Sequence, residues 1–254
     1  MPIKITQDPG DPPPFWDSER ELFFEAAIRD LGAQLANATR RAVRSAAHST
    51  GSNAFESLNR AASEGVGDTT FGLDEEPERI VAEWAKSLAR AAPLSVLTED
   101  TGWRHFGPTA SGDLLDGGFD HGGPRIAIDP VDGTRNLMFD IRSAWASIAL
   151  APPGGGAPKL SDVSLGYLRE LPDSRAAEAR ILVGRPRTSE CTVERVQLDS
   201  SPQGVLLQSL RLATDTDARA SGGFFPFFRY HPDMREELAH IEANFFERLE
   251  THEG

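Results

Sequence analysis

Two aspartates in the segment IAIDPVDGTRN, residues 126–136, are the side chains best suited to chemistry. Asp129 and Asp132 lie three residues apart, directly after the apolar run RIAI at 125–128, which predicts a buried strand. Pro130 restricts the backbone between the two carboxylates, and Gly133 permits a tight approach after them. Because ligands gather at the carboxyl ends of strands in open sheets, this pattern favours a binding site. Considered alone, Asp-Pro-x-Asp is also typical of a type I turn without a function.

A second acidic pair follows another predicted strand. The run LSVL at 94–97 leads into Thr98, Glu99 and Asp100. If the two strands are neighbours, three or four carboxylates converge, and such a cluster of like charges is stable mainly when cations fill it. Hard oxygen ligands favour Mg²⁺. Considered alone, the Glu99-Asp100 pair is typical of an exposed strand end, and Asp74, which precedes a predicted helix, is typical of an N-cap.

The rest of the sequence predicts an α+β protein, with helices and strands in separate runs. Apolar residues at three- and four-residue steps predict helices over 18–47, after Asp74, and from Pro232 onward. Further strands are predicted at 143–151, 162–168, 179–184, 192–198 and 204–210, and loop at 50–70. We expect three segments: an extended Pro-rich lead-in over 1–17, an N-terminal α+β metal-binding half over 18–150, and a second sheet-containing half over 151–254.

Composition narrows the classes of partner. Acidic residues outnumber basic ones by 39 to 26, and the resulting net charge of −13 argues against nucleic acid and membrane surfaces as partners. Cys191 is the only cysteine, so no internal disulfide is expected, as in a reducing compartment. The sequence shows neither an apolar run of transmembrane length nor a signal-peptide pattern at its start. We therefore expect a cytoplasmic protein.

DPVDGTRN resembles the DP-[IL]-DGT-x-N signature of the inositol monophosphatase-like family of Mg²⁺-dependent, lithium-sensitive phosphatases, which includes the fructose-1,6-bisphosphatases. GDTTFGLD at 67–74 is similar to that family's D-x-x-T-x-x-D segment, and LTED at 97–100 is similar to its Glu-Glu metal motif. The resemblance implies a layered α/β/α/β/α sugar-phosphatase fold. It also implies a phosphomonoesterase whose substrate is a small phosphorylated polyol, sugar or nucleotide.

The same resemblance implies roles for individual residues. Thr134, hydrogen-bonded to Asp74, would orient and deprotonate the attacking water, and the backbone N–H groups of Gly133 and Thr134 would hold the phosphate. The implied Mg²⁺ ligands are Glu99, Asp129, Asp132 and the carbonyl of Val131.

One element of the family is missing. Its signature W-D-x-A-A-G, whose aspartate binds the second metal ion, has no counterpart here, so we expect a fold that is incomplete at its C-terminal end. An uncovered helix face and sheet edge would then favour self-association, with a homodimer as the simplest form. A phosphatase-like chain that binds Mg²⁺ or phosphorylated ligands without efficient turnover is the alternative. A haloacid dehalogenase-type phosphatase is disfavoured, because its D-x-D-G-T motif spaces the aspartates two apart.

Overall fold

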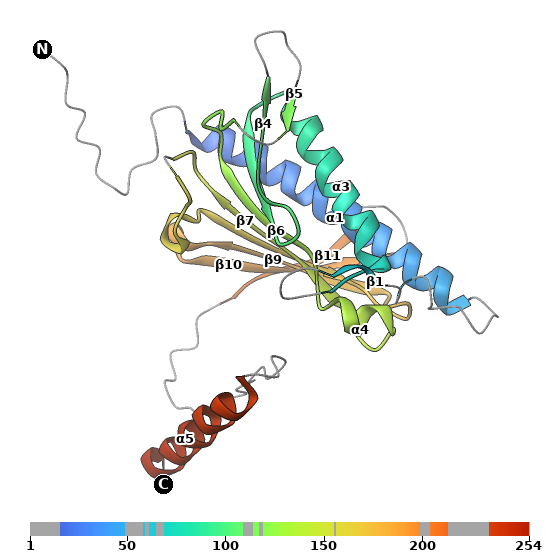
Figure 1. Cartoon of the computed structure of the whole chain (residues 1–254), viewed down its shortest axis with the longest axis vertical. Helices are drawn as coiled ribbons and strands as arrows, with labels where there is room; N and C mark the ends of the chain where they lie inside the picture. The colour runs from blue at the N-terminus through green and yellow to red at the C-terminus, as the bar shows by residue number, and fades with distance from the viewer. Residues whose placement is uncertain are drawn as a thin grey trace, which may run out of the picture. The chain divides into compact units, whose positions relative to one another are not determined.

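The computed structural model describes residues 16–48, 58, 61–64, 69–108, 114–116, 119–154, 156–198, 204–212 and 234–253. The chain divides into two compact units, residues 1–212 and 213–254. Helix α5 (Arg235–Glu253) is the element described in the second unit. The other described elements belong to the first unit, which contains every residue of the predicted site (Figure 1). None of the described helices combines the length and the apolar composition needed to cross a membrane.

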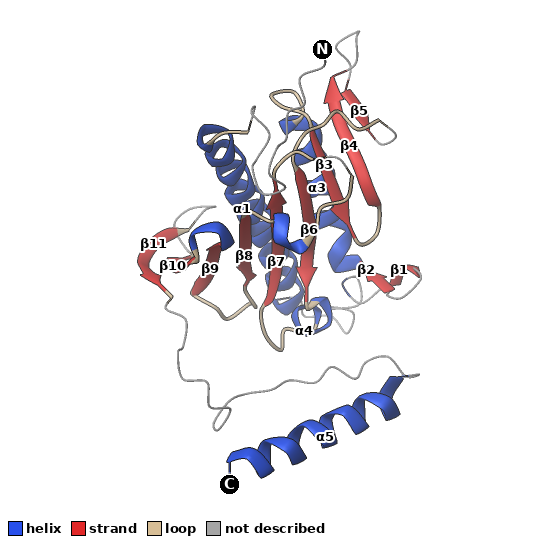
Figure 2. Cartoon of the chain, turned by 90° about the vertical axis from the view of Figure 1, so that its left-hand side faces the viewer, coloured by secondary structure: helices blue, strands red, loops and turns tan. Residues whose placement is uncertain are grey.

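Two long helices, α1 (Ser18–His48) and α3 (Gly72–Leu88), cover one face of a large sheet (Figure 2). The carboxylate of Asp17 accepts the Arg20 N–H at 2.9 Å and so caps the first turn of α1. The indole N–H of Trp84 donates to the Ala27 carbonyl at 3.1 Å, which ties α3 to α1. This contact fixes the C-terminal part of α3 against α1.

The large sheet has nine strands in the order β11-β10-β9-β8-β7-β6-β3-β4-β5. Their bounds are β3 Leu94–Thr98, β4 Gly102–Pro108, β5 Leu114–Asp116, β6 Arg125–Asp132, β7 Ala144–Ala151, β8 Leu165–Leu171, β9 Glu178–Arg185, β10 Glu190–Gln197 and β11 Val205–Arg211. Neighbouring strands are antiparallel except β3 and β6, which are parallel. Three short turns of helix complete the unit: α4 (Thr134–Met138), η1 (Leu160–Asp162) and η2 (Pro186–Thr188). A separate antiparallel pair, β1 (Ala61–Glu64) and β2 (Thr69–Phe71), lies where the sequence predicted loop.

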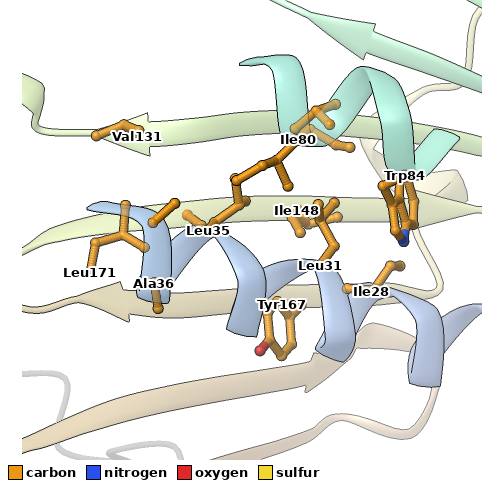
Figure 3. Close-up of a cluster of buried hydrophobic side chains, with 14 of the residues drawn as sticks. Ile28, Leu31, Leu35, Ala36, Ile80, Trp84, Val131, Ile148, Tyr167 and Leu171 are labelled. Carbon is orange, nitrogen blue, oxygen red and sulfur yellow. The ribbon is translucent and has the colours of Figure 1, made fainter. Parts of the chain in front are cut away.

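The hydrophobic core lies between the two helices and the sheet (Figure 3). Ile28 and Leu31 of α1 are fully buried in this cluster, and Ile148 of β7 and Tyr167 of β8 belong to the same cluster. The Tyr167 ring approaches α1 closely, because a Cβ built on Gly32 would lie 2.6 Å from its Cε1 atom. The helix layer is therefore held tightly against the central strands.

The α+β class is confirmed, but the predicted halves are not separate. β7 and β8 lie on either side of the boundary expected at residue 150, and they pair from Ala144↔Leu171 to Leu150↔Leu165. Strands β8 to β11 extend the first sheet instead of forming a second one, since consecutive antiparallel strands join the growing sheet at its edge. The described residues of this unit thus form one helix layer on one large sheet. Residues 1–15 of the expected lead-in lie outside the described residues.

Candidate active site

The parallel pairing of β3 with β6 brings the two acidic segments together. Their ladder ends with Leu97 opposite Ala127. Glu99 follows directly after the end of β3, and Asp129 lies two residues further along β6, close enough for the charge of Glu99 to raise the pKa of Asp129. The convergence of carboxylates was expected only if these two strands are neighbours, and the pairing of β3 with β6 meets that condition.

A β-bulge in β6 places Asp129 and Asp132 on the same face of the sheet. In a regular strand, residues three apart point to opposite faces. Here Asp129 pairs with Ser147 and Asp132 with Trp145, so three steps along β6 match two steps along β7. The extra residue restores the common orientation of the two carboxylates. The Asp-Pro-x-Asp segment is therefore part of a bulged strand, and its interpretation as an isolated turn is wrong.

The pKa of Asp129 reflects its burial and the charges of the acidic side chains around it. Burial raises the pKa of Asp129 to about 6, the Val131 N–H that donates to its Oδ1 at 3.1 Å lowers it, and the charges of Asp132, Glu99 and Asp74 raise it further. Four carboxylates thus share one electrostatic environment. Bringing a divalent cation into it would relieve their repulsion, and all the donors are the hard oxygens that Mg²⁺ prefers.

These carboxylates are not drawn into a finished coordination cage. Glu99 and Asp132 are exposed, and among the described residues no three acidic, histidine or cysteine side chains are arranged so that they could hold a metal ion. Mutual repulsion of the charged groups is a sufficient physical reason for side chains to remain apart. The backbone therefore brings the predicted ligands to one place, while the side chains keep a more open arrangement.

Asp74 and Thr134 meet across sixty residues of sequence, as predicted. Thr134 Oγ1 lies 3.0 Å from Asp74 Oδ1 and 2.8 Å from the Val131 carbonyl oxygen. The other carboxylate oxygen of Asp74 accepts the Phe71 N–H at 3.0 Å, which closes the first turn of α3. Asp74 is the third residue of that helix, not its N-cap, so one side chain serves the helix start and the candidate site together.

The turn after Asp132 requires its glycine. Gly133 has φ 96° and ψ 27°, a left-handed conformation that other residues rarely adopt, and it is the N-cap of α4. Its carbonyl accepts the N–H of Asn136 at 3.0 Å. The first N–H groups of a helix have no partner within it, so this turn presents backbone donors beside the acidic cluster.

Two of the predicted site residues, Glu99 and Asp129, border a concavity on the sheet face opposite the helices. They line one end of this concavity, which has a volume of about 820 Å³. Its other walls are mainly apolar or small side chains, among them Leu97, Ala127 and Ala149. A ligand can therefore reach the acidic cluster without displacing the helix layer.

Sequence reasoning missed one acidic neighbour, Glu78. Burial and the charges of Asp100, Asp74 and Asp129 raise the pKa of Glu78 to about 7, while Arg104 acts in the opposite direction. The available signal was its spacing, because residues four apart lie on the same face of a helix and Glu78 follows Asp74 by four in α3.

No family model and no curated protein matches this sequence. Solved structures do match. They include a fructose-1,6-bisphosphatase of Leishmania major in holo form, with 12% identity and a TM-score of 0.49 over 76% of this chain and 55% of that chain. The extragenic suppressor protein SuhB of Bartonella henselae has 17% identity and a TM-score of 0.36 over 73% and 52%. An IMPase of Thermotoga maritima has 16% identity and a TM-score of 0.38 over 72% and 55%.

The chain spans about half the length of the solved structures that it matches, with 55%, 52% and 55% of those three chains covered. The resemblance to the inositol monophosphatase-like family stays a prediction from the sequence, and the DPVDGTRN motif carries it.

Proposed function

We propose that this chain carries the catalytic centre of a Mg²⁺-dependent phosphomonoesterase that acts on a small phosphorylated polyol, sugar or nucleotide. The observation that carries the proposal is the hydrogen bond from Thr134 to Asp74, made beside the carboxylates that raise the pKa of Asp129. The start of α3, the end of β3 and the bulge in β6 together build this arrangement. An isolated surface turn needs no such cooperation between separate segments.

The proposed Mg²⁺ ligands are Glu99, Asp129, Asp132 and the carbonyl of Val131. Their oxygen donors fit Mg²⁺. The positive charge of the ion would offset the repulsion between Asp129 and the neighbouring carboxylates, and this favours binding. When bound, Mg²⁺ would lower the pKa of a coordinated water and offset negative charge on the phosphate.

The protein's own groups would orient the attacking water. The Thr134 hydroxyl has one proton and two acceptors within reach, Asp74 Oδ1 and the Val131 carbonyl. With the Val131 carbonyl engaged as a ligand, that proton is directed to Asp74, and the lone pairs of Oγ1 remain available to accept a hydrogen bond from water. Thr134 would thereby orient the attacking water. As the water loses a proton to Oγ1, the hydroxyl proton of Thr134 would pass to Asp74. The N–H groups of Gly133 and Thr134 would hold the phosphate oxygens.

Two measurements test the proposal. Titration calorimetry of the chain with Mg²⁺ should show a saturable site that Asp129→Asn removes. Phosphate release from a panel of sugar, polyol and nucleotide monophosphates should depend on Mg²⁺ and fall in Thr134→Val. Mg²⁺ binding with no phosphate release from any compound would instead favour a chain that binds without turnover, and the absence of both would refute the proposal.

A further inference from the structure

Glu78 occupies the junction between helix α3 and the hairpin that carries Glu99. The side chain is partly buried, and it faces the sheet one helical turn after Asp74. It lines a small cavity of about 20 Å³ together with Thr98, Thr101 and Arg104. The other walls of this cavity are apolar side chains, those of Val81, Ala82, Ala85, Val96 and Phe106.

The far wall of the cavity is the turn that presents Glu99. Thr98 ends β3, and Thr101 precedes β4, with Glu99 and Asp100 between them. The two threonine hydroxyls lie 2.8 Å apart, and the Thr101 N–H donates to Thr98 Oγ1 at 3.3 Å. These bonds close the turn, and Glu78 lines the same small cavity as both threonines. The conformation of the turn decides where the Glu99 carboxylate points.

Glu78 also contributes charge to the acidic cluster. The charges of Asp100, Asp74 and Asp129 act on it, so its own charge acts equally on them. A negative group beside a cation site strengthens binding of the cation, whereas without the cation it adds repulsion to the folded state.

We propose that Glu78 is a positioning residue of the divalent cation site: it supports the Thr98–Thr101 turn that presents Glu99 and adds negative charge behind the ligands. The inference rests on the proposed function, because it concerns the same cation. Glu78 would not touch the cation or the substrate. Groups that orient metal ligands from behind typically account for a 10- to 100-fold change in metal affinity.

The test compares Glu78→Gln, Glu78→Asp and the matched control Glu83→Gln in the full chain. Glu83 lies on the same helix but is exposed and pairs with Arg79 at 2.6 Å. Mg²⁺ affinity is measured by titration calorimetry at about pH 8, above the raised pKa of about 7 for Glu78, so that this carboxylate is mostly ionised as well. The unfolding midpoint is measured by urea denaturation in the presence of a chelator.

We expect Glu78→Gln to weaken Mg²⁺ binding about tenfold while raising the unfolding midpoint of the metal-free chain. Glu78→Asp, which keeps the charge, should recover part of the affinity, and Glu83→Gln should change neither quantity. A merely structural residue would lower the midpoint when neutralised, so a fall in both quantities would overturn the inference. Unchanged affinity in Glu78→Gln would do the same and leave the proposed function standing. A parent chain that binds no Mg²⁺ would refute the proposed function and this inference together.

Discussion

Asp129→Asn should stabilise the metal-free protein while it abolishes tight Mg²⁺ binding. The pKa of Asp129 is raised from 3.8 to about 6 in the folded chain. Each pKa unit corresponds to about 1.4 kcal/mol, so the full shift corresponds to about 3 kcal/mol of destabilisation at neutral pH. Asp129 is only partly buried, and screening by solvent reduces this figure to about 1–2 kcal/mol. Asparagine removes the charge and keeps an oxygen that can accept the Val131 N–H.

The effect has a defined pH dependence. Because the pKa of Asp129 is higher in the folded than in the unfolded chain, the folded state binds the extra proton between about pH 4 and pH 6. The destabilisation is therefore fully present above that window and disappears as the pH falls through it. Urea denaturation in a chelator should show a gain of about 1–2 kcal/mol for Asp129→Asn near pH 8 and almost none near pH 4.

Two controls separate this reasoning from a general effect of charge. Asp30→Asn changes an exposed aspartate of α1 that bonds Gln34, and it should alter stability equally little at both pH values. With saturating Mg²⁺ the parent should be more stable than Asp129→Asn, because the parent gains stability from the bound ion and the variant does not.

Asp100→Asn should weaken Mg²⁺ binding less than Asp129→Asn. A pH-independent gain, or a loss of stability near pH 8, would refute the account of the cluster.

Three further substitutions test other parts of the site and core. Thr134→Val should lower the rate of phosphate release about 100-fold and the free energy of unfolding by less than about 1 kcal/mol. Thr134→Ser should retain much of the rate, and equal rates for the Val and Ser variants would exclude a role for the hydroxyl. Gly133→Ala forces a Cβ into the left-handed conformation at φ 96°, and urea denaturation should show a loss of about 1–2 kcal/mol; an unchanged midpoint would contradict the strain. Gly32→Ala places a Cβ 2.6 Å from the Tyr167 ring, so it should lower the free energy of unfolding by about 1–3 kcal/mol and with it the thermal midpoint. A smaller loss in a Tyr167→Leu background would identify that ring as the cause.

Local pattern predicted the two long helices of the first unit and most strands of the large sheet. Apolar periodicity predicted α1 to within a residue of its end, and the runs at 94–97 and 125–128 lie within β3 and β6. The motif resemblance predicted the Asp74–Thr134 hydrogen bond, which joins α3 to α4. Short-range preferences and motifs succeed here because helix and strand periods, and the residue types that a site needs, are written along the chain.

Features that depend on how distant segments pack did not follow from local pattern. The boundary expected at residue 150 is absent because β7 and β8 pair across it. The buried Arg125 pairs with Asp120 and so lowers the pKa of that carboxyl. Arg125 also donates to Ser95 Oγ, and the pairing of β3 with β6 brings these two distant residues together.

The site itself shows the same division. The sequence placed Asp129 and Asp132 three residues apart, a spacing that points opposite ways in a regular strand. The bulge against β7 is what turns both to one face, because the partner strand takes two steps where β6 takes three. Likewise, the charge of Glu78 reaches the cluster only because α3 packs across the ends of β3 and β4. Residue types and spacing therefore specify the chemistry that is available, while strand pairing and helix packing decide which of those groups meet, since contacts between distant segments depend on the whole fold.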